Sequence, residues 1–208
     1  KLTTEFLTNV QSLNYALPNA YDGVALYSTV DGNGAARFGA ANGNLITGTG
    51  VTNADVLNDF AHAQQQFLSF LDPSGESPIF SEHDVAYKSM HAIIPPELNQ
   101  TFQELSGLEF LRTDLTASTA QSNLLKGTFQ FHINQYLTNP NDWYIVLAHP
   151  YWKPFVYRQP GKNGLRQIFQ DFNNSDDARK YNEYAVMADI RVGPGPWAPF
   201  TTIKINNT

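Results

Sequence analysis

The chain has 208 residues, of which 42% are hydrophobic, 13% aromatic and 15% charged, and its net charge is −6. The length suits one domain or two small ones, and the aromatic content argues against a disordered chain and favours extended contact surfaces. The absence of cysteine excludes disulfides, iron–sulfur clusters and thiol nucleophiles, while the negative net charge disfavours nucleic-acid binding through phosphates.

The first fifty residues predict a short helix, a short strand and a long loop. Pro18 ends the helical pattern, and the run at 24–27 is typical of a strand. Six glycines and three asparagines between residues 31 and 50 indicate a long loop, which we expect to be disordered or weakly packed in the isolated chain. The helix is predicted from apolar residues near helical spacing: Leu2, Phe6, Val10, Leu13.

The clearest predicted element is a one-sided helix at about residues 53–71. Thr52 and Asp55 form a capping-box-like start, and the Asp-Pro-Ser-Gly sequence at 72–75 ends the helix with turn residues. Polar residues occupy the opposite face, so the helix should pack on one side only. The predicted packing face consists of Leu57, Phe60, Gln64, Phe67, Leu68, Leu71.

Strands dominate the rest of the chain after a second helix that starts at Pro95-Pro96 and presents an apolar stripe. A hairpin turn at Asn163-Gly164 should join two of the strands, and residues 193–197 should break the long one. Two helices followed by at least five strands predict an α+β fold with antiparallel-rich sheets. The predicted strands are residues 91–94, 129–133, 143–148, 155–157, 165–169, 184–192 and 203–205.

No pattern in the sequence indicates catalysis. The run Glu82-His83-Asp84 with His91 nearby contains metal-ligating residue types, but its spacing matches no metal motif, and a polar loop is the simpler interpretation. His149 combines with Asp142 into a triad only on paper, since no nucleophile motif accompanies it. We therefore expect no enzyme activity and no catalytic, cofactor-binding or metal-binding residues.

Short stretches spread over residues 21–200 carry a resemblance to a known family. Together they resemble the Mu-like prophage major head subunit family. The sequence departs from the family pattern at Val30-Asp31, where the family has His-Pro, and at Tyr157, where it has Gln. In chain order the matching stretches are 21–29 (YDGVALYST), the loop that follows, the helix at 53–71 with its Asp-Pro-Ser-Gly exit, 92–98 (AIIPPEL), 143–146 (WYIV), 153–158 (KPFVYR) and 190–197 (IRVGPGPW).

The resemblance implies a structural subunit of a bacteriophage or prophage icosahedral head, which self-assembles into the capsid shell that encloses the genome. The implied fold is the Hong Kong 97-type capsid fold, with a long spine helix at about 53–71. A peripheral domain would comprise 1–95 and 185–208, and an axial domain 96–184. The family extends further at its N-terminus and the chain starts at Lys1, so we expect a processed or trimmed piece of a longer protein.

The same resemblance implies the partners. Copies of the chain would associate as pentamers and hexamers, with scaffold, portal and decoration proteins as further partners, and with neither sequence-specific nucleic-acid binding nor a membrane. The subunit would assemble in the host cytoplasm and reside in the virion. Apolar residues in loops are candidate subunit contacts, with burial in the core as the alternative for each: Tyr151, Trp152, Trp197, Phe200.

Two other functions remain open. A carbohydrate- or protein-binding β-rich module would be favoured by Trp152 and Trp197 exposed in a shared groove. A hydrolase with an unrecognised site would be favoured by a deep pocket that joins His149 or His83 to carboxylates.

Overall fold

The computed structural model describes residues 20–108, 110–112, 120–123, 125–158, 165–170, 180, 185–190 and 193–207. The chain divides into two compact units, Lys1–Phe155 with Pro196–Thr208, and Val156–Gly195. Helices and strands occur together, which confirms the predicted α+β class. The helix expected near residues 2–13 lies outside the described residues. Within the described ranges, no helix is both long and apolar enough to cross a lipid bilayer.

A five-stranded mixed sheet forms the centre of the first unit. Its middle strand is β6, as the continuous apolar run predicts, and β6 pairs antiparallel with β11 and β2. The two edge strands, β1 and β5, run parallel to their neighbours, so the sheet is mixed rather than antiparallel throughout. In spatial order the strands are β1 (Leu45–Thr47), β11 (Thr202–Asn206), β6 (Trp143–Leu147), β2 (Met90–Ile94) and β5 (Gln130–Ile133).

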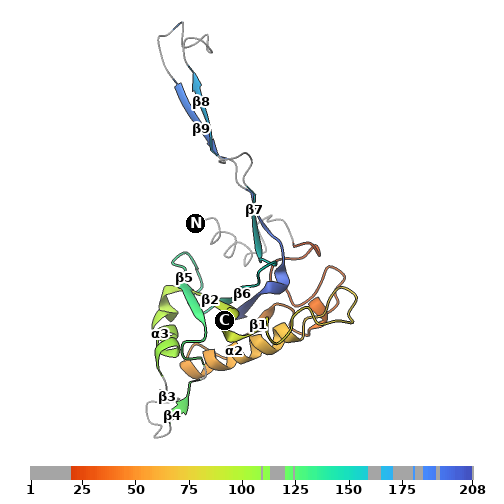
Figure 1. Cartoon of the computed structure of the whole chain (residues 1–208), viewed down its shortest axis with the longest axis vertical. Coiled ribbons are helices and arrows are strands. Elements are labelled where there is room, and N and C mark those ends of the chain that lie inside the picture. Colours follow the sequence, from red (N-terminus) through yellow and green to blue (C-terminus); the bar gives the residue numbers. More distant parts are fainter. Residues whose placement is uncertain are drawn as a thin grey trace. The chain divides into compact units, whose positions relative to one another are not determined.

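Helix α2 (Asn53–Leu68) packs along one face of this sheet (Figure 1). It begins at the predicted capping box: the Thr52 hydroxyl accepts the Asp55 amide N–H at 3.3 Å, and the Asp55 carboxylate accepts the Thr52 amide N–H at 3.1 Å. The helix ends earlier than residue 71 because the Leu71 N–H donates to the carbonyl of Phe38 at 2.8 Å. As predicted, one side is buried, but the face is shifted from the predicted one: Phe60 and Phe67 are buried, whereas Asp59, expected on the polar face, is buried as well. The buried residues are Val56, Asp59, Phe60, Ala63 and Phe67, and the predicted Leu57, Gln64, Leu68 and Leu71 are half-buried.

Phe60 is the centre of an aromatic cluster between the helices and the sheet. Its ring centroid lies 4.8 Å from that of Phe129 and 5.1 Å from that of Trp143. Helix α3 (Asn99–Gly107), which confirms the second predicted helix, adds Phe102 at 6.2 Å from Phe60. Because successive residues of β6 face opposite sides of the sheet, Trp143 points toward the helices and its neighbour Tyr144 points away from them.

The second face of the sheet is covered by a smaller cluster around Tyr144. Leu26 and Tyr27 pack on it, with the Tyr27 and Tyr144 ring centroids 5.4 Å apart. The Tyr27 hydroxyl lies 3.1 Å from Thr202 Oγ1, and burial raises the pKa of Tyr27, so its phenol stays neutral.

Residues 24–27 do not form the predicted strand. The carbonyl oxygens of Ala25 and Leu26 accept hydrogen bonds from Arg37 Nη1 at 3.0 and 2.7 Å, and Leu26 also accepts one from Asn44 Nδ2 at 2.7 Å. Side-chain donors therefore occupy the carbonyl oxygens that, in a strand, would accept hydrogen bonds from a neighbouring strand. Tertiary contacts override the local β-propensity of this segment.

The prediction of a disordered or weakly packed segment at 31–50 is wrong. Arg37 and Asn44 are buried, and strand β1 lies within the segment. Gly43 has φ +51°, and a Cβ there would collide with the Ser28 carbonyl oxygen. At this position glycine permits a tight turn and a close approach of two backbone segments, so the glycine supports an ordered, packed segment.

The strands of the second unit pair differently from the prediction. Instead of a hairpin between 155–157 and 165–169, β8 (Leu165–Gln170) pairs antiparallel with β9 (Ala185–Ile190). Strand β7 (Phe155–Arg158) pairs with β10 (Gly193–Pro196). The Gly-Pro segment that was predicted to break the long strand is therefore a separate strand with a different partner from β9. The turn at Asn163-Gly164 lies outside the described residues.

The remaining elements of the first unit are short. They are η1 (Arg37–Gly39), η2 (Tyr87–Ser89), η3 (Pro96–Leu98), η4 (Pro199–Thr201), and the paired strands β3 (Phe110–Arg112) and β4 (Ala120–Ser122). The two compact units are defined by packing alone. The assignment of residues to peripheral and axial domains stays a prediction.

Replacing the central core ring tests this packing. We expect Phe60→Ala to lower the free energy of unfolding by about 3–5 kcal/mol, because the lost aromatic contacts leave a cavity. Gln65→Ala, on the exposed side of the same helix, should change it by less than about 0.5 kcal/mol. Urea unfolding followed by circular dichroism measures both. Equal losses would contradict a one-sided α2.

Candidate functional site

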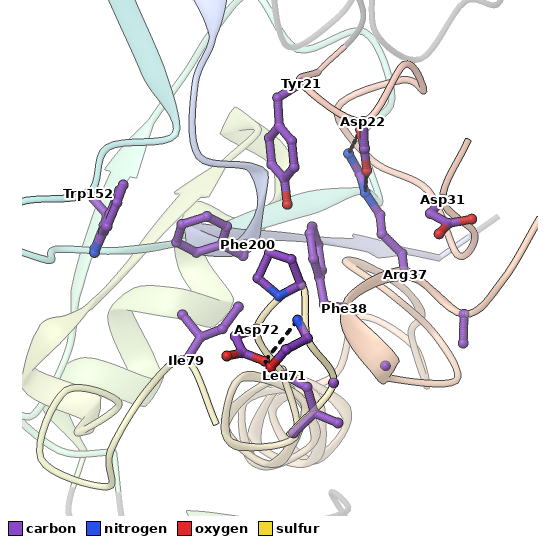
Figure 2. Close-up of a pocket in the computed structure, with 15 residues that line it drawn as sticks. Tyr21, Asp22, Asp31, Arg37, Phe38, Leu71, Asp72, Ile79, Trp152 and Phe200 are labelled. Carbon is purple, nitrogen blue, oxygen red and sulfur yellow. Dashed lines mark hydrogen bonds and ion pairs between the residues drawn. The ribbon is translucent and has the colours of Figure 1, made fainter. Parts of the chain in front are cut away.

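An open cavity of about 680 Å³ lies in the surface of the first unit (Figure 2). One wall is aromatic: Trp152, Phe200 and Phe38 follow one another, with ring centroids 5.6 Å apart for the first two and 6.2 Å for the second pair. Leu71 and Ile79 add aliphatic surface below this row. The cavity therefore offers a largely apolar surface to a ligand or to another protein.

A tight turn positions Trp152 at the mouth of this cavity. His149 Nδ1 accepts the amide N–H groups of Tyr151 and Trp152, at 3.3 and 3.2 Å. Lys153 Nζ donates to the His149 carbonyl at 2.7 Å, and the Trp197 N–H donates to the Pro154 carbonyl at 2.9 Å. These bonds hold the turn, and with it the indole of Trp152, in place.

The four residues predicted as contacts differ in their surroundings. Tyr151 is 84% exposed, Trp197 55% and Trp152 43%, whereas Phe200 is half-buried between Phe38, Phe80 and Trp152. Trp152 and Phe200 line the same cavity, and of the described lining residues none is Trp197 or Tyr151. This cavity therefore does not bring together the two tryptophans that would favour a carbohydrate-binding module.

Sequence reasoning missed Tyr21 and Arg37. Tyr21 is 64% exposed and stands at the rim of the cavity, and Arg37 is fully buried beneath it. Arg37 Nε and Nη2 donate to the two carboxylate oxygens of Asp22, at 2.7 and 3.0 Å, and Nη1 donates to Asn44 Oδ1 at 3.0 Å. The adjoining Tyr21-Asp22-Gly23 turn was the only signal in the sequence, since no local pattern predicts a buried arginine.

The cavity carries a negative balance of charge. Asp22, Asp31 and Asp72 line it together with a single guanidinium, that of Arg37. A hydrogen bond from the Ser74 hydroxyl is the main cause that lowers the pKa of Asp72, so its carboxylate is ionised at neutral pH. Partial desolvation at the cavity rim raises the pKa of Tyr21, and the Asp22 charge adds to this, so the phenol stays neutral.

The residues considered for a hydrolase site or a metal site do not come together at this cavity. Neither His149 nor His83 is among the described lining residues of this cavity. Asp84 turns back on its own loop, where it accepts the Ser81 hydroxyl at 2.6 Å, and the described residues contain no group of three or more metal-ligating side chains. Asp142 pairs with Lys204 at 2.8 Å.

Comparison with known proteins gives no assignment. The chain matches no protein-family model, and it matches no curated protein.

Removing the buried guanidinium tests its role beneath the cavity. We expect Arg37→Met to lower the free energy of unfolding by about 3–5 kcal/mol, since it leaves Asp22 and several carbonyls without their donor in a buried place. Lys88→Met removes an exposed cation and should change the value by less than about 0.5 kcal/mol. Urea unfolding curves compare the two. A small effect of Arg37→Met would show that water replaces the guanidinium at no cost.

Proposed function

We propose that the chain is a structural subunit of a phage or prophage head and assembles with copies of itself into a Hong Kong 97-type shell. In this proposal α2 is the spine helix, residues 1–95 and 185–208 form the peripheral domain, and 96–184 form the axial domain. The order of sequence stretches that resemble the Mu-like prophage major head subunit family supports the proposal, together with the structural features below.

The carrying observation is the two-stranded pairing of β8 with β9. Among the described residues of the second unit, each strand has a single partner strand. A two-stranded ribbon by itself is only marginally stable in water, because it lacks a further strand or helix to cover it. Packing against neighbouring copies would stabilise such a ribbon, as in a closed shell of repeated subunits.

Exposed aromatic side chains support the same proposal. Tyr151, Trp152 and Trp197 are exposed. Tyr21 is also exposed, at the rim of the larger cavity that Trp152 lines. Large aromatic side chains are enriched where protein surfaces meet, because they bury much area at a low entropic cost. The one-sided burial of α2 is also consistent with a helix that crosses a subunit near its surface.

Self-association of the chain tests this function directly. We expect light scattering over a concentration series to show rings or larger particles. Because Tyr151 is a candidate contact, Tyr151→Ser should weaken association by about tenfold. Tyr136→Ser is the matched control, since Tyr136 is also exposed but lies in another loop. A strict monomer at every concentration would overturn the proposal.

Hydrogen exchange provides an independent test. In the isolated chain we expect amides of β8 and β9 to exchange far faster than those of β6, because β6 has a partner strand on both sides. Assembly should slow exchange in β8 and β9 while leaving β6 unchanged. Slow exchange in β8 and β9 of a proven monomer would contradict the argument from the ribbon.

A further inference from the structure

A second cavity, of about 290 Å³, opens on the face of the sheet opposite to the one on which α2 and α3 pack. It lies where β2, β6 and the edge strand β5 meet the segment 148–155. The register explains its composition: Ile93 of β2 is paired with His132 of β5, and His91 with Val146 of β6. These alternating positions share one face of the sheet.

Three basic side chains gather at this cavity: His91, His132 and Lys153. His91 Nδ1 lies 3.2 Å from His132 Nε2, and the two rings are inclined by only 11°. Lys153 Nζ donates to the His149 carbonyl, and an ammonium group has further N–H donors. Of the described residues that line this cavity, none carries a carboxylate.

The surroundings of His91 oppose its protonation. Burial lowers the pKa of His91, and the charges of His132 and Lys153 lower it further. His132 on β5 and Lys153 on the segment after β6 are the titratable groups that face His91 here, and the other lining residues are apolar. An anion between the three groups would replace this repulsion with attraction and with charge-assisted hydrogen bonds.

We propose that this cavity binds an organic oxyanion, a carboxylate or a phosphate monoester that carries a small apolar body. Lys153 and the two imidazoles hold the oxyanion. The apolar body rests on Ile93, Val146 and Pro154, which form an apolar floor beside the basic groups. The site stands apart from the assembly function, because it depends only on contacts within the first unit of a single chain.

The sign of the pH dependence follows from the charges. A bound anion stabilises the protonated imidazoles, so binding raises the pKa of His91. Affinity should therefore increase as the pH falls through the histidine range.

Titration of the full chain with four small anions tests the proposal. Phenyl phosphate and inorganic phosphate form one arm, and benzoate and acetate form the other, so the arms distinguish a phosphate from a carboxylate. In at least one arm the aromatic anion should bind more tightly than the anion that lacks the ring. Histidine NMR signals should show saturable shifts for His91 and His132 and a higher pKa of His91 in the bound state.

Three variants locate the site. Lys153→Met keeps the aliphatic stem of an exposed side chain and should weaken binding by about tenfold, the worth of one hydrogen bond to a charged group. His91→Gln should remove most of the pH dependence, because it removes the imidazole whose pKa the bound anion raises. His83→Gln, an exposed histidine outside the cavity, should change neither property. Thermal unfolding of each variant verifies that it is folded.

The proposal fails if no anion gives saturable shifts at His91 and His132. It also fails if Lys153→Met and His83→Gln bind equally well while both remain folded. Equal affinity for the aromatic anions and their counterparts in both arms would reduce the site to nonspecific charge attraction and would overturn the assignment of an organic ligand.

Discussion

The buried guanidinium of Arg37 is the interaction on which the first unit most depends. It joins Asp22 to the carbonyls of Ala25 and Leu26 and to the side chain of Asn44, so it holds together stretches that have no regular secondary structure. A buried charge is tolerated only when it is paired and hydrogen-bonded, and here the guanidinium is paired with Asp22 and each of its three nitrogens donates a hydrogen bond. The segment that Arg37 fixes covers Tyr144 on the second face of the sheet and also forms the floor of the larger cavity.

The two faces of the central sheet have different uses. The helices bury one face completely through Phe60 and its aromatic neighbours, and this face supplies stability. Among the described residues, Leu26 and Tyr27 cover the second face at Tyr144, and the smaller cavity opens on the same face beside His91 and His132. Residues 149–155 contribute to both cavities, since Trp152 lines the acidic aromatic one and Lys153 the basic one. One turn, held by His149, thus places two chemically opposite surfaces on a single unit.

The pairing of strands in the second unit connects structure to the proposed assembly. A subunit of a shell is selected for the complex it forms and need not bury all of its apolar surface when alone. Two-stranded pairing of β8 with β9 and exposed aromatic side chains are both costly for a solitary protein in water. Both features are understandable in a chain whose neighbours complete its packing. The low fraction of charged residues is consistent with the same interpretation.

Local chemistry determined what the sequence alone revealed. The capping box of α2, the helical segment after Pro95 (η3 followed by α3) and the apolar central strand β6 all depend on neighbours within a few residues. The tertiary structure decided the rest. A buried Arg37, the ordered segment at 31–50 and the pairing of β8 with β9 depend on partners distant in the sequence, which no periodicity encodes. The histidine pair has the same origin, because a parallel register between β2 and β5 brings His91 beside His132 although 41 positions separate them.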